Sequence, residues 1–297
     1  MALTVSAQQH DPADWGGDHV GKPVPIYEDG NACLFCHRTT IGPSWQTNRH
    51  ATTIRGIDDE VRARQLADSP RDADYAIGRE AILRFLKRAK SYGTVELLNP
   101  RWDVRKQVWH DPKGNAHATS FAERCAGCHT SGVDSIAKTF QMVSLDCHTC
   151  HGIAVPEHTE DGSLMLLAKK ERTLPRVEIS ICGACHLRGG TSKSTGLPFP
   201  NNFVPGDNLF KDFAVDLSEK RIQSENPGEA HILQNTRDVT LAGKTEVTCT
   251  TCHDIHAQST AKHVKLPEQP LCFTCHTQGE PMKTIRPYNR HSATCEY

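Results

Sequence analysis

The chain has 297 residues, of which 37% are hydrophobic and only 6% aromatic, and its formal net charge is −1 at pH 7. That is a thin supply of apolar side chains for an ordinary core of this length. The 34 basic residues are balanced by 35 acidic ones, which gives no argument for a nucleic-acid partner. No stretch of the sequence approaches the length of a transmembrane helix.

The N-terminal segment is predicted to be irregular. Residues 8–32 are rich in glycine and proline, which is typical of a loop. Before it, Val5-Ser6-Ala7 resembles the small-residue end of a signal-peptide cleavage site. Two interpretations stay open: residues 1–7 are the remnant of an export leader, or they are an ordinary N-terminus.

The first recognisable motif is Cys33-Leu34-Phe35-Cys36-His37, a C-x-x-C-H block. The same block recurs five times, at residues 125–129, 147–151, 182–186, 249–253 and 272–276. Positions i, i+3 and i+4 of a helical turn lie on one face. Two cysteines at this spacing can form thioethers with haem vinyl groups, and the next residue, histidine, lies under the iron. The motif therefore predicts attachment of c-type haem.

Zinc ribbons and disulfide frameworks also use paired cysteines, but neither requires a histidine directly after the second cysteine. Here the histidine is present in all six blocks, and the blocks use twelve of the thirteen cysteines. We therefore predict six haem c groups. The predicted attachment residues are Cys33, Cys36, Cys125, Cys128, Cys147, Cys150, Cys182, Cys185, Cys249, Cys252, Cys272 and Cys275. The predicted proximal iron ligands are His37, His129, His151, His186, His253 and His276.

Six haems change the expectations for folding, charge and location. Each porphyrin is a large apolar plate, so the core is expected to be largely cofactor and the apoprotein is not expected to fold. Six ferric haems with ionised propionates would take the net charge to about −7. Covalent haem attachment takes place outside the cytoplasmic membrane, so we expect a periplasmic or extracellular protein.

The stretches between blocks predict few regular elements. Residues 58–92 carry apolar side chains at steps of three and four, which predicts a packing helix ending near Gly93. Residues 94–111 predict a short hairpin around Asn99-Pro100, with Trp102 and Trp109 covering a haem edge. Residues 187–248 are expected to form an extended loop that wraps around the fourth haem, with a surface docking arm as the less favoured alternative. Residues 277–297 are expected to be irregular.

The histidine count allows a second ligand for every iron. Seventeen histidines less six proximal ones leave eleven for six distal positions. The distal candidates, in order of preference, are His50, His158, His231, His256, His291 and His19, with His110, His117 and His263 in reserve. His148 lies between two haem cysteines and is expected to point away from its own haem, where it could serve a neighbour.

Part of the pattern resembles a known family. The first block followed by Trp45 and His50, then C-x-x-C-H-x-x-G at 125–132, C-x-x-C-H-G at 147–152 and the fourth block, are similar to the tetrahaem cytochromes that accept electrons from hydroxylamine oxidoreductase. This resemblance covers residues 33–190 and implies that His158 is an iron ligand. The last two blocks resemble additions in larger members of the superfamily that contains pentahaem nitrite reductase.

The expected fold is a single unit over residues 1–297, mainly α-helical with long irregular loops and little β-structure, around stacked haems. It comprises a tetrahaem-like part at 33–190, then a wrapping loop and two further haems at 191–297. The blocks starting at Cys125 and Cys147, and those at Cys249 and Cys272, are expected to hold close haem pairs. Cys295 is either a free thiol or the start of a further block in a longer chain.

Two classes of function, and a structural one, stay open. Bis-histidine haems have no open position, which favours an electron carrier with a redox protein as donor and another as acceptor. The alternative is a reductase or oxidase of a small nitrogen or sulfur compound at one open-site haem, with His110, His117 or Tyr75 nearby; no C-x-x-C-Lys block supports it. The third is a subunit of an extracellular haem filament. A membrane-associated quinol complex is a further candidate partner, and a small-molecule substrate is not favoured.

Overall fold

A computed structural model describes residues 12–110, 120–167, 174–242 and 248–257. The helices are α1 (Asn31–His37), α2 (Gly42–Trp45), α3 (Ile57–Arg64), α4 (Phe121–Arg124), α5 (Ala126–His129), α6 (His148–His151), α7 (Pro175–His186), α8 (Glu219–Ser224), α9 (Pro227–Arg237) and α10 (Cys249–Cys252). Short helical turns are η1 (Pro156–Thr159), η2 (Gly162–Leu164), η4 (Leu209–Lys211) and η5 (Asp238–Ala242). The strands are β1 (Ile54–Gly56), β2 (Tyr75–Ile77), β3 (Ile82–Arg88), β4 (Val95–Asp103), β5 (Val108–His110), β6 (Thr130–Ser131), β7 (Met142–Val143), β8 (Thr191–Ser192) and β9 (Phe213–Ala214).

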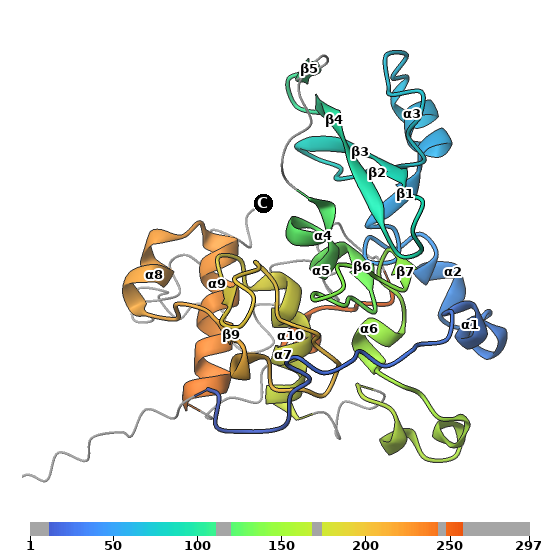
Figure 1. Cartoon of the computed structure of the whole chain (residues 1–297). Coiled ribbons are helices and arrows are strands. Elements are labelled where there is room, and N and C mark those ends of the chain that lie inside the picture. The colour runs from blue at the N-terminus through green and yellow to red at the C-terminus, as the bar shows by residue number, and fades with distance from the viewer. Residues whose placement is uncertain (1–11, 111–119, 168–173, 243–247, 258–297) are drawn as a thin grey trace, which may run out of the picture.

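A five-stranded antiparallel sheet projects from one end of the molecule (Figure 1). Its strands follow the chain order β1 to β5, and α3 covers part of it. Leu83 and Phe85, both fully buried, pack there with Leu66 and Ala76. The sheet thus has an apolar cluster of its own, and strand structure is more extensive than the sequence led us to expect. Helical residues still outnumber strand residues in the described parts.

The long helix predicted over residues 58–92 is wrong beyond α3. A turn at Gly78, with φ of +89°, separates β2 from β3. A side-chain Cβ at Gly78 would lie 2.1 Å from the carbonyl oxygen of Ile82, so only glycine fits this turn. A bulge between Arg84 and Leu86 lets neighbouring Phe85 and Leu86 both be buried. Because of this bulge, apolar residues recur here at steps of three and four, which is the spacing expected of a helix.

The hairpin predicted over residues 94–111 exists, but its turn was placed wrongly. β4 runs straight through Asn99-Pro100, and the turn falls between Asp103 and Val108. Trp109 stacks on Phe85 with ring centroids 5.5 Å apart, and Trp102 lies 5.3 Å from Trp109. The contacts found for both tryptophans are with the apolar cluster of the sheet, and their cover for a haem edge stays a prediction.

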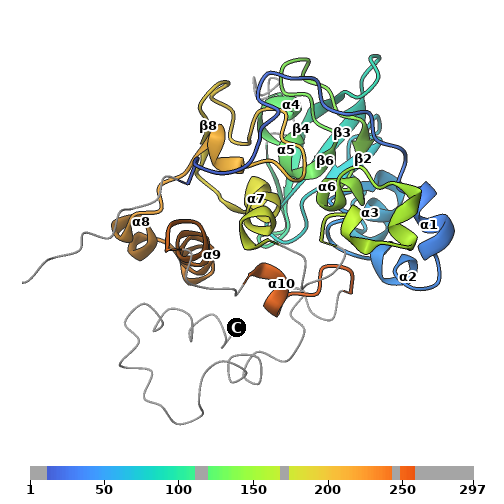
Figure 2. The ribbon, with the colours of Figure 1, turned by 90° about the horizontal axis from the view of Figure 1, so that it is seen from below.

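Helix α7 lies at the centre of the second half of the chain (Figure 2). It packs against α9, η4 and η5, and its Ile179 shares an apolar cluster with Leu209, Phe213 and Leu233. The extended loop predicted over 187–248 is wrong for residues 219–242, which form α8, α9 and η5. Residues 187–218 are mostly irregular, as predicted, but they contribute to the buried cluster. Of the glycines and prolines in 187–248, Pro227 and Gly228 lie in the first turn of α9.

The N-terminal segment is irregular between residues 12 and 29, as predicted. It runs along residues 202–208, where the backbone amide of Asn208 donates to the Gly17 carbonyl at 2.9 Å. His19 Nδ1 bonds to the Asp207 carboxylate at 2.9 Å. No helix in the described ranges is long and apolar enough to cross a membrane.

Candidate haem sites

Five of the six C-x-x-C-H blocks lie in described residues, and each lies within a helix, to within one residue at the ends of the block. α1 carries the first block, α5 the second and α6 the third, while α7 ends in the fourth and α10 begins the fifth. A helical turn brings both cysteines and the histidine of a block to one face, as the motif requires. The sixth block, with Cys272, Cys275 and His276, lies outside the described residues.

The blocks gather around α7. Cys128 Sγ lies 3.9 Å from the carbonyl oxygen of Cys185, and Cys185 Sγ lies 3.5 Å from that of Gly127, so the second and fourth blocks are in contact. The third block contacts α7 through α6, and the fifth through α10. The first block lies beside the third, because the Gly30 amide just before α1 donates to Asp146 Oδ2 at 3.0 Å, and Leu34 and Cys147 line one cavity.

The second and third blocks, which we expected to hold a close haem pair, are also joined. Ser131 Oγ lies 2.5 Å from Thr149 Oγ1 and accepts a hydrogen bond from the backbone amide of Asp146 at 2.8 Å. Further contacts, however, join the first block to the third, the second to the fourth, and the fourth to the fifth. Sequence separation alone did not indicate these long-range neighbours.

Three block histidines face a histidine from a distant segment. His37 and His158 have ring centroids 6.3 Å apart with planes inclined by 29°. His50 and His186 are 6.2 Å apart at 68°, and His151 and His256 are 5.8 Å apart at 17°. His50, His158 and His256 were each predicted as distal candidates, but the sequence did not indicate which block each would face.

These separations fit two ligands on one iron. A metal–imidazole nitrogen bond is about 2 Å long in zinc sites, and the ring centre lies about 1 Å beyond, so two imidazoles on opposite sides of a metal have centroids about 6 Å apart. Hydrogen bonds also point the ligand nitrogens correctly. The Nδ1 atoms of His151 and His158 lie 2.6 Å from the carbonyl oxygens of Leu166 and Val155, which leaves Nε2 as the ligating atom. The donor set present fits haem.

Burial favours the neutral imidazoles that iron binds. It lowers the pKa of His129 to about 4, and the nearby positive charges of Arg188 and Arg55 act in the same direction. Burial likewise lowers the pKa of His151 and that of His256. Before attachment, the hydrogen bond with Cys147 lowers the pKa of the Cys33 thiol to about 6.

A cavity of about 520 Å³ lies between the first and third blocks. Leu34 lines it from inside the first block and Cys147 from the third, and Trp45 and Ala51 line it from the intervening chain. Trp45 also lies edge-on to His256, with ring centroids 6.3 Å apart. Trp45, which follows the first block in the sequence, therefore lies beside both the first and the third blocks.

The remaining candidates are placed as follows. His19 holds Asp207, and His110 lies on β5 with its Nε2 3.5 Å from Asp103 Oδ2. His148 is buried; its Nδ1 bonds to the Gly152 carbonyl at 2.7 Å and its ring stacks on Tyr27. His231 lies on α9. The candidates His291, His117 and His263 lie outside the described residues.

A buried carboxylate that the sequence did not single out fixes the fifth block onto the fourth. Glu178 on α7 is 1% exposed. It accepts hydrogen bonds from Thr248 Oγ1 at 2.8 Å, from the Thr250 amide at 2.6 Å and from Thr250 Oγ1 at 2.9 Å. Its oxygen, Cys182 Sγ and Cys249 Sγ lie within 4.8 Å of one another. Cys182 and Cys249, the first cysteines of the fourth and fifth blocks, therefore lie close together beside Glu178.

Comparison with known families supports haem attachment. Residues 84–152 match the family described as cytochrome c554 and c-prime, and residues 242–281 match the doubled CXXCH motif. The first match falls inside the 33–190 region of resemblance to tetrahaem cytochromes. No protein with a curated description matches the sequence.

Solved structures of two cytochromes are similar to this one. The outer cell wall cytochrome OcwA superposes with a TM-score of 0.54 at 18% identity, over 84% of this chain and 67% of that one. The undecahaem cytochrome from the S-layer of Carboxydothermus ferrireducens gives 0.50 at 17% identity, over 88% of this chain. This chain has the fold of a multihaem c-type cytochrome. It spans 44% of the length of that S-layer cytochrome.

Proposed function

We propose that this multihaem cytochrome transfers electrons through six covalently attached c-type haems, most of them ligated by two histidines. The observation that carries the proposal is the set of three histidine pairs at 5.8 to 6.3 Å. An iron with two imidazole ligands has no position for a substrate and can only change its oxidation state. Electron transfer between protein partners follows from that chemistry.

The pairs support the following distal ligands for three haems. His158 would serve the first haem opposite His37, His256 the third opposite His151, and His50 the fourth opposite His186. The haem, when bound, supplies the one-electron chemistry. The protein contributes the ligand nitrogens, the hydrogen bonds that orient them and the packing that excludes water.

Location and partners follow from the same chemistry. The names of the similar structures place those proteins in an S-layer and an outer cell wall. Together with covalent haem attachment, this supports a periplasmic or extracellular site for the present chain. A redox protein donor and acceptor, or further copies of multihaem cytochromes in an array, are the partners that such a carrier needs.

Catalysis at an open-site haem is the second candidate, and it centres on His129. Within the described parts of the chain, no histidine ring contact involves this residue, although its block contacts the fourth block closely. Arg55 and Arg188 lie near enough to affect its pKa, so cationic groups of the kind that stabilise an anionic substrate are at hand.

The histidine pairs can be tested by substitution. His158→Ala should leave all haems attached, because the thioethers are covalent, and should convert one haem from low spin to high spin in the ferric spectrum. His110→Ala is the matched control, because His110 lies on the sheet and bonds to Asp103. An unchanged low-spin spectrum in His158→Ala would contradict the assignment.

The choice between carrier and enzyme needs a separate measurement. A carrier should pass electrons rapidly to a nonspecific acceptor and should not turn over nitrite, hydroxylamine or tetrathionate. Steady turnover of any of these, with a high-spin signal that changes on their addition, would favour the open-site enzyme.

A further inference from the structure

The loop between α2 and β1 carries a buried side chain that touches two candidate ligand segments at once. Asn48 is 0% exposed. Its Oδ1 accepts a hydrogen bond from the backbone amide of His50 at 2.8 Å. Its Nδ2 donates to the carbonyl oxygen of Ile255 at 2.5 Å and to that of His256 at 3.3 Å. One amide therefore joins the segment that faces the fourth block to the segment that faces the third.

Only a side chain with both a donor and an acceptor satisfies this arrangement. The network fixes the orientation of the amide, because an N–H faces one end and two carbonyls face the other. An aspartate would keep the acceptor but direct an anionic oxygen at two carbonyls. An alanine would leave the His50 amide and the Ile255 and His256 carbonyls without this partner.

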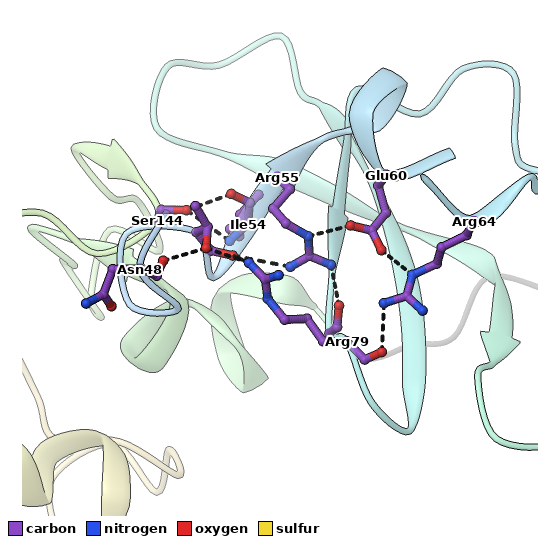
Figure 3. Close-up of polar contacts among 9 residues, drawn as sticks. Asn48, Ile54, Arg55, Glu60, Arg64, Arg79 and Ser144 are labelled. Atoms are coloured by element: carbon purple, nitrogen blue, oxygen red, sulfur yellow. Dashed lines mark hydrogen bonds and ion pairs between the residues drawn. The ribbon is translucent and has the colours of Figure 1, made fainter. Parts of the chain in front are cut away.

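The far end of the same segment is held independently (Figure 3). The Ile54 amide donates to Ser144 Oγ at 2.9 Å, and Ser144 Oγ donates back to the Ile54 carbonyl at 2.8 Å. Arg79 donates to the Thr52 carbonyl at 2.9 Å, and Arg55 donates to the same carbonyl at 3.2 Å. Residues 52–55 are thus fixed to the protein around them, so Asn48 controls the end of the segment where His50 lies.

We propose that Asn48 is a shared positioning residue for the distal ligands of the third and fourth haems. The inference rests on the ligand assignment proposed above. Asn48 orients His50 through the backbone amide of His50, and it orients His256 through the backbone carbonyl of His256. One side chain therefore sets the imidazole planes of two haems. Those planes cross at 68° in the fourth pair and at 17° in the third. A change at Asn48 alters both angles together, while the first pair, His37 and His158, has no bond to it.

Electron paramagnetic resonance of the ferric, fully loaded protein provides the readout, because the low-spin signal of a bis-imidazole haem depends on the angle between its two ligand planes. Asn48→Ala should shift two low-spin signals and leave the others in place. Asn48→Asp keeps the acceptor for the His50 amide, so it should shift the signal of the third haem and retain that of the fourth. Thr47→Ala, at an exposed neighbour, is the control and should shift neither.

The signals are assigned first with His50→Ala and His256→Ala, each of which should remove one low-spin signal. If neither does, the ligand assignment itself fails. If both do, but Asn48→Ala and Asn48→Asp give the wild-type spectrum, the assignment stands and the role of Asn48 is refuted. If intact mass shows that Asn48→Ala has lost haem, the isosteric variant Asn48→Asp provides the test. A spectral shift confined to the third haem in Asn48→Asp supports the proposal, and an unshifted spectrum overturns it.

Discussion

Replacing Glu178 should loosen the fifth haem block without unfolding the protein. This carboxylate is buried on α7 and accepts three hydrogen bonds, all from residues that surround the start of α10. Glu178→Ala removes every one of them. Glu178→Gln keeps the size of the side chain and one acceptor oxygen, and it brings an amide NH₂ towards the hydroxyl groups of Thr248 and Thr250, which can act as acceptors.

The expected magnitudes follow from the kind of bond. A hydrogen bond to a charged group contributes about 1.5–3 kcal/mol, against about 0.5–1.5 kcal/mol for a neutral one. Glu178→Gln should therefore destabilise the docking of α10 by about 1–2 kcal/mol. For Glu178→Ala we expect about 3–5 kcal/mol, less than three full bonds because both threonine hydroxyl groups can rotate towards other acceptors.

Hydrogen exchange of the Thr250 amide in the loaded protein measures this docking directly, because that amide is itself bonded to Glu178. Exchange should quicken about 5- to 30-fold in Glu178→Gln and more than about 100-fold in Glu178→Ala. Glu219→Gln, at a carboxylate with a side chain 54% exposed, serves as the control and should leave this amide unchanged. Wild-type exchange in both Glu178 variants would refute the anchoring role.

Three further predictions concern haem number, acid stability and redox coupling. Intact mass spectrometry should find six haem masses above the polypeptide, and four or fewer would contradict the interpretation of the blocks. Burial opposes ionisation of Glu60, but hydrogen bonds and charges from Arg55 and Arg64 outweigh it and lower its pKa below 4.5. The contribution of ionised Glu60 to the free energy of unfolding is therefore complete above about pH 4.5, and it is lost as the pH falls through the pKa of Glu60 in the folded protein. In Glu60→Gln, the free energy of unfolding should consequently fall less steeply with decreasing pH below about pH 4.5. A redox titration should spread over a wide range, since an electron on one iron raises the energy of reducing its neighbour; one curve for all haems would exclude coupling.

The attachment sites were readable from sequence because their chemistry is local. Two thioethers and a ligand must come from one helical turn, so each site is complete within five residues. In the five described blocks the residues between the cysteines are helical, although Cys125 and Cys147 precede their helices and His253 follows its own. The distal candidates needed more than local pattern. His50, His158 and His256 could be proposed from supply and resemblance, but only the fold places each opposite a particular block.

The failures have physical causes. Apolar residues in 73–89 recur at helical steps, yet a glycine turn and a bulge make them strands, because tertiary packing outweighs a short periodic pattern. Asn48 and Glu178 carry no motif at all. Their importance comes from burial beside distant backbone groups, and a buried asparagine or glutamate cannot be told from an exposed one in a single sequence.

The sheet between the first and second blocks bears on how the protein matures. Its cluster, with Phe85, Leu83 and Trp109 at the centre, is built wholly from residues 57–109 and needs no porphyrin to bury its side chains. We expect the apoprotein as a whole not to fold, and this cluster predicts that residues 57–109 are the segment able to order before haem is attached. The first attachment site would then be separated from the rest by a folded spacer, and the ligation machinery would meet two accessible stretches of chain, one on each side of it.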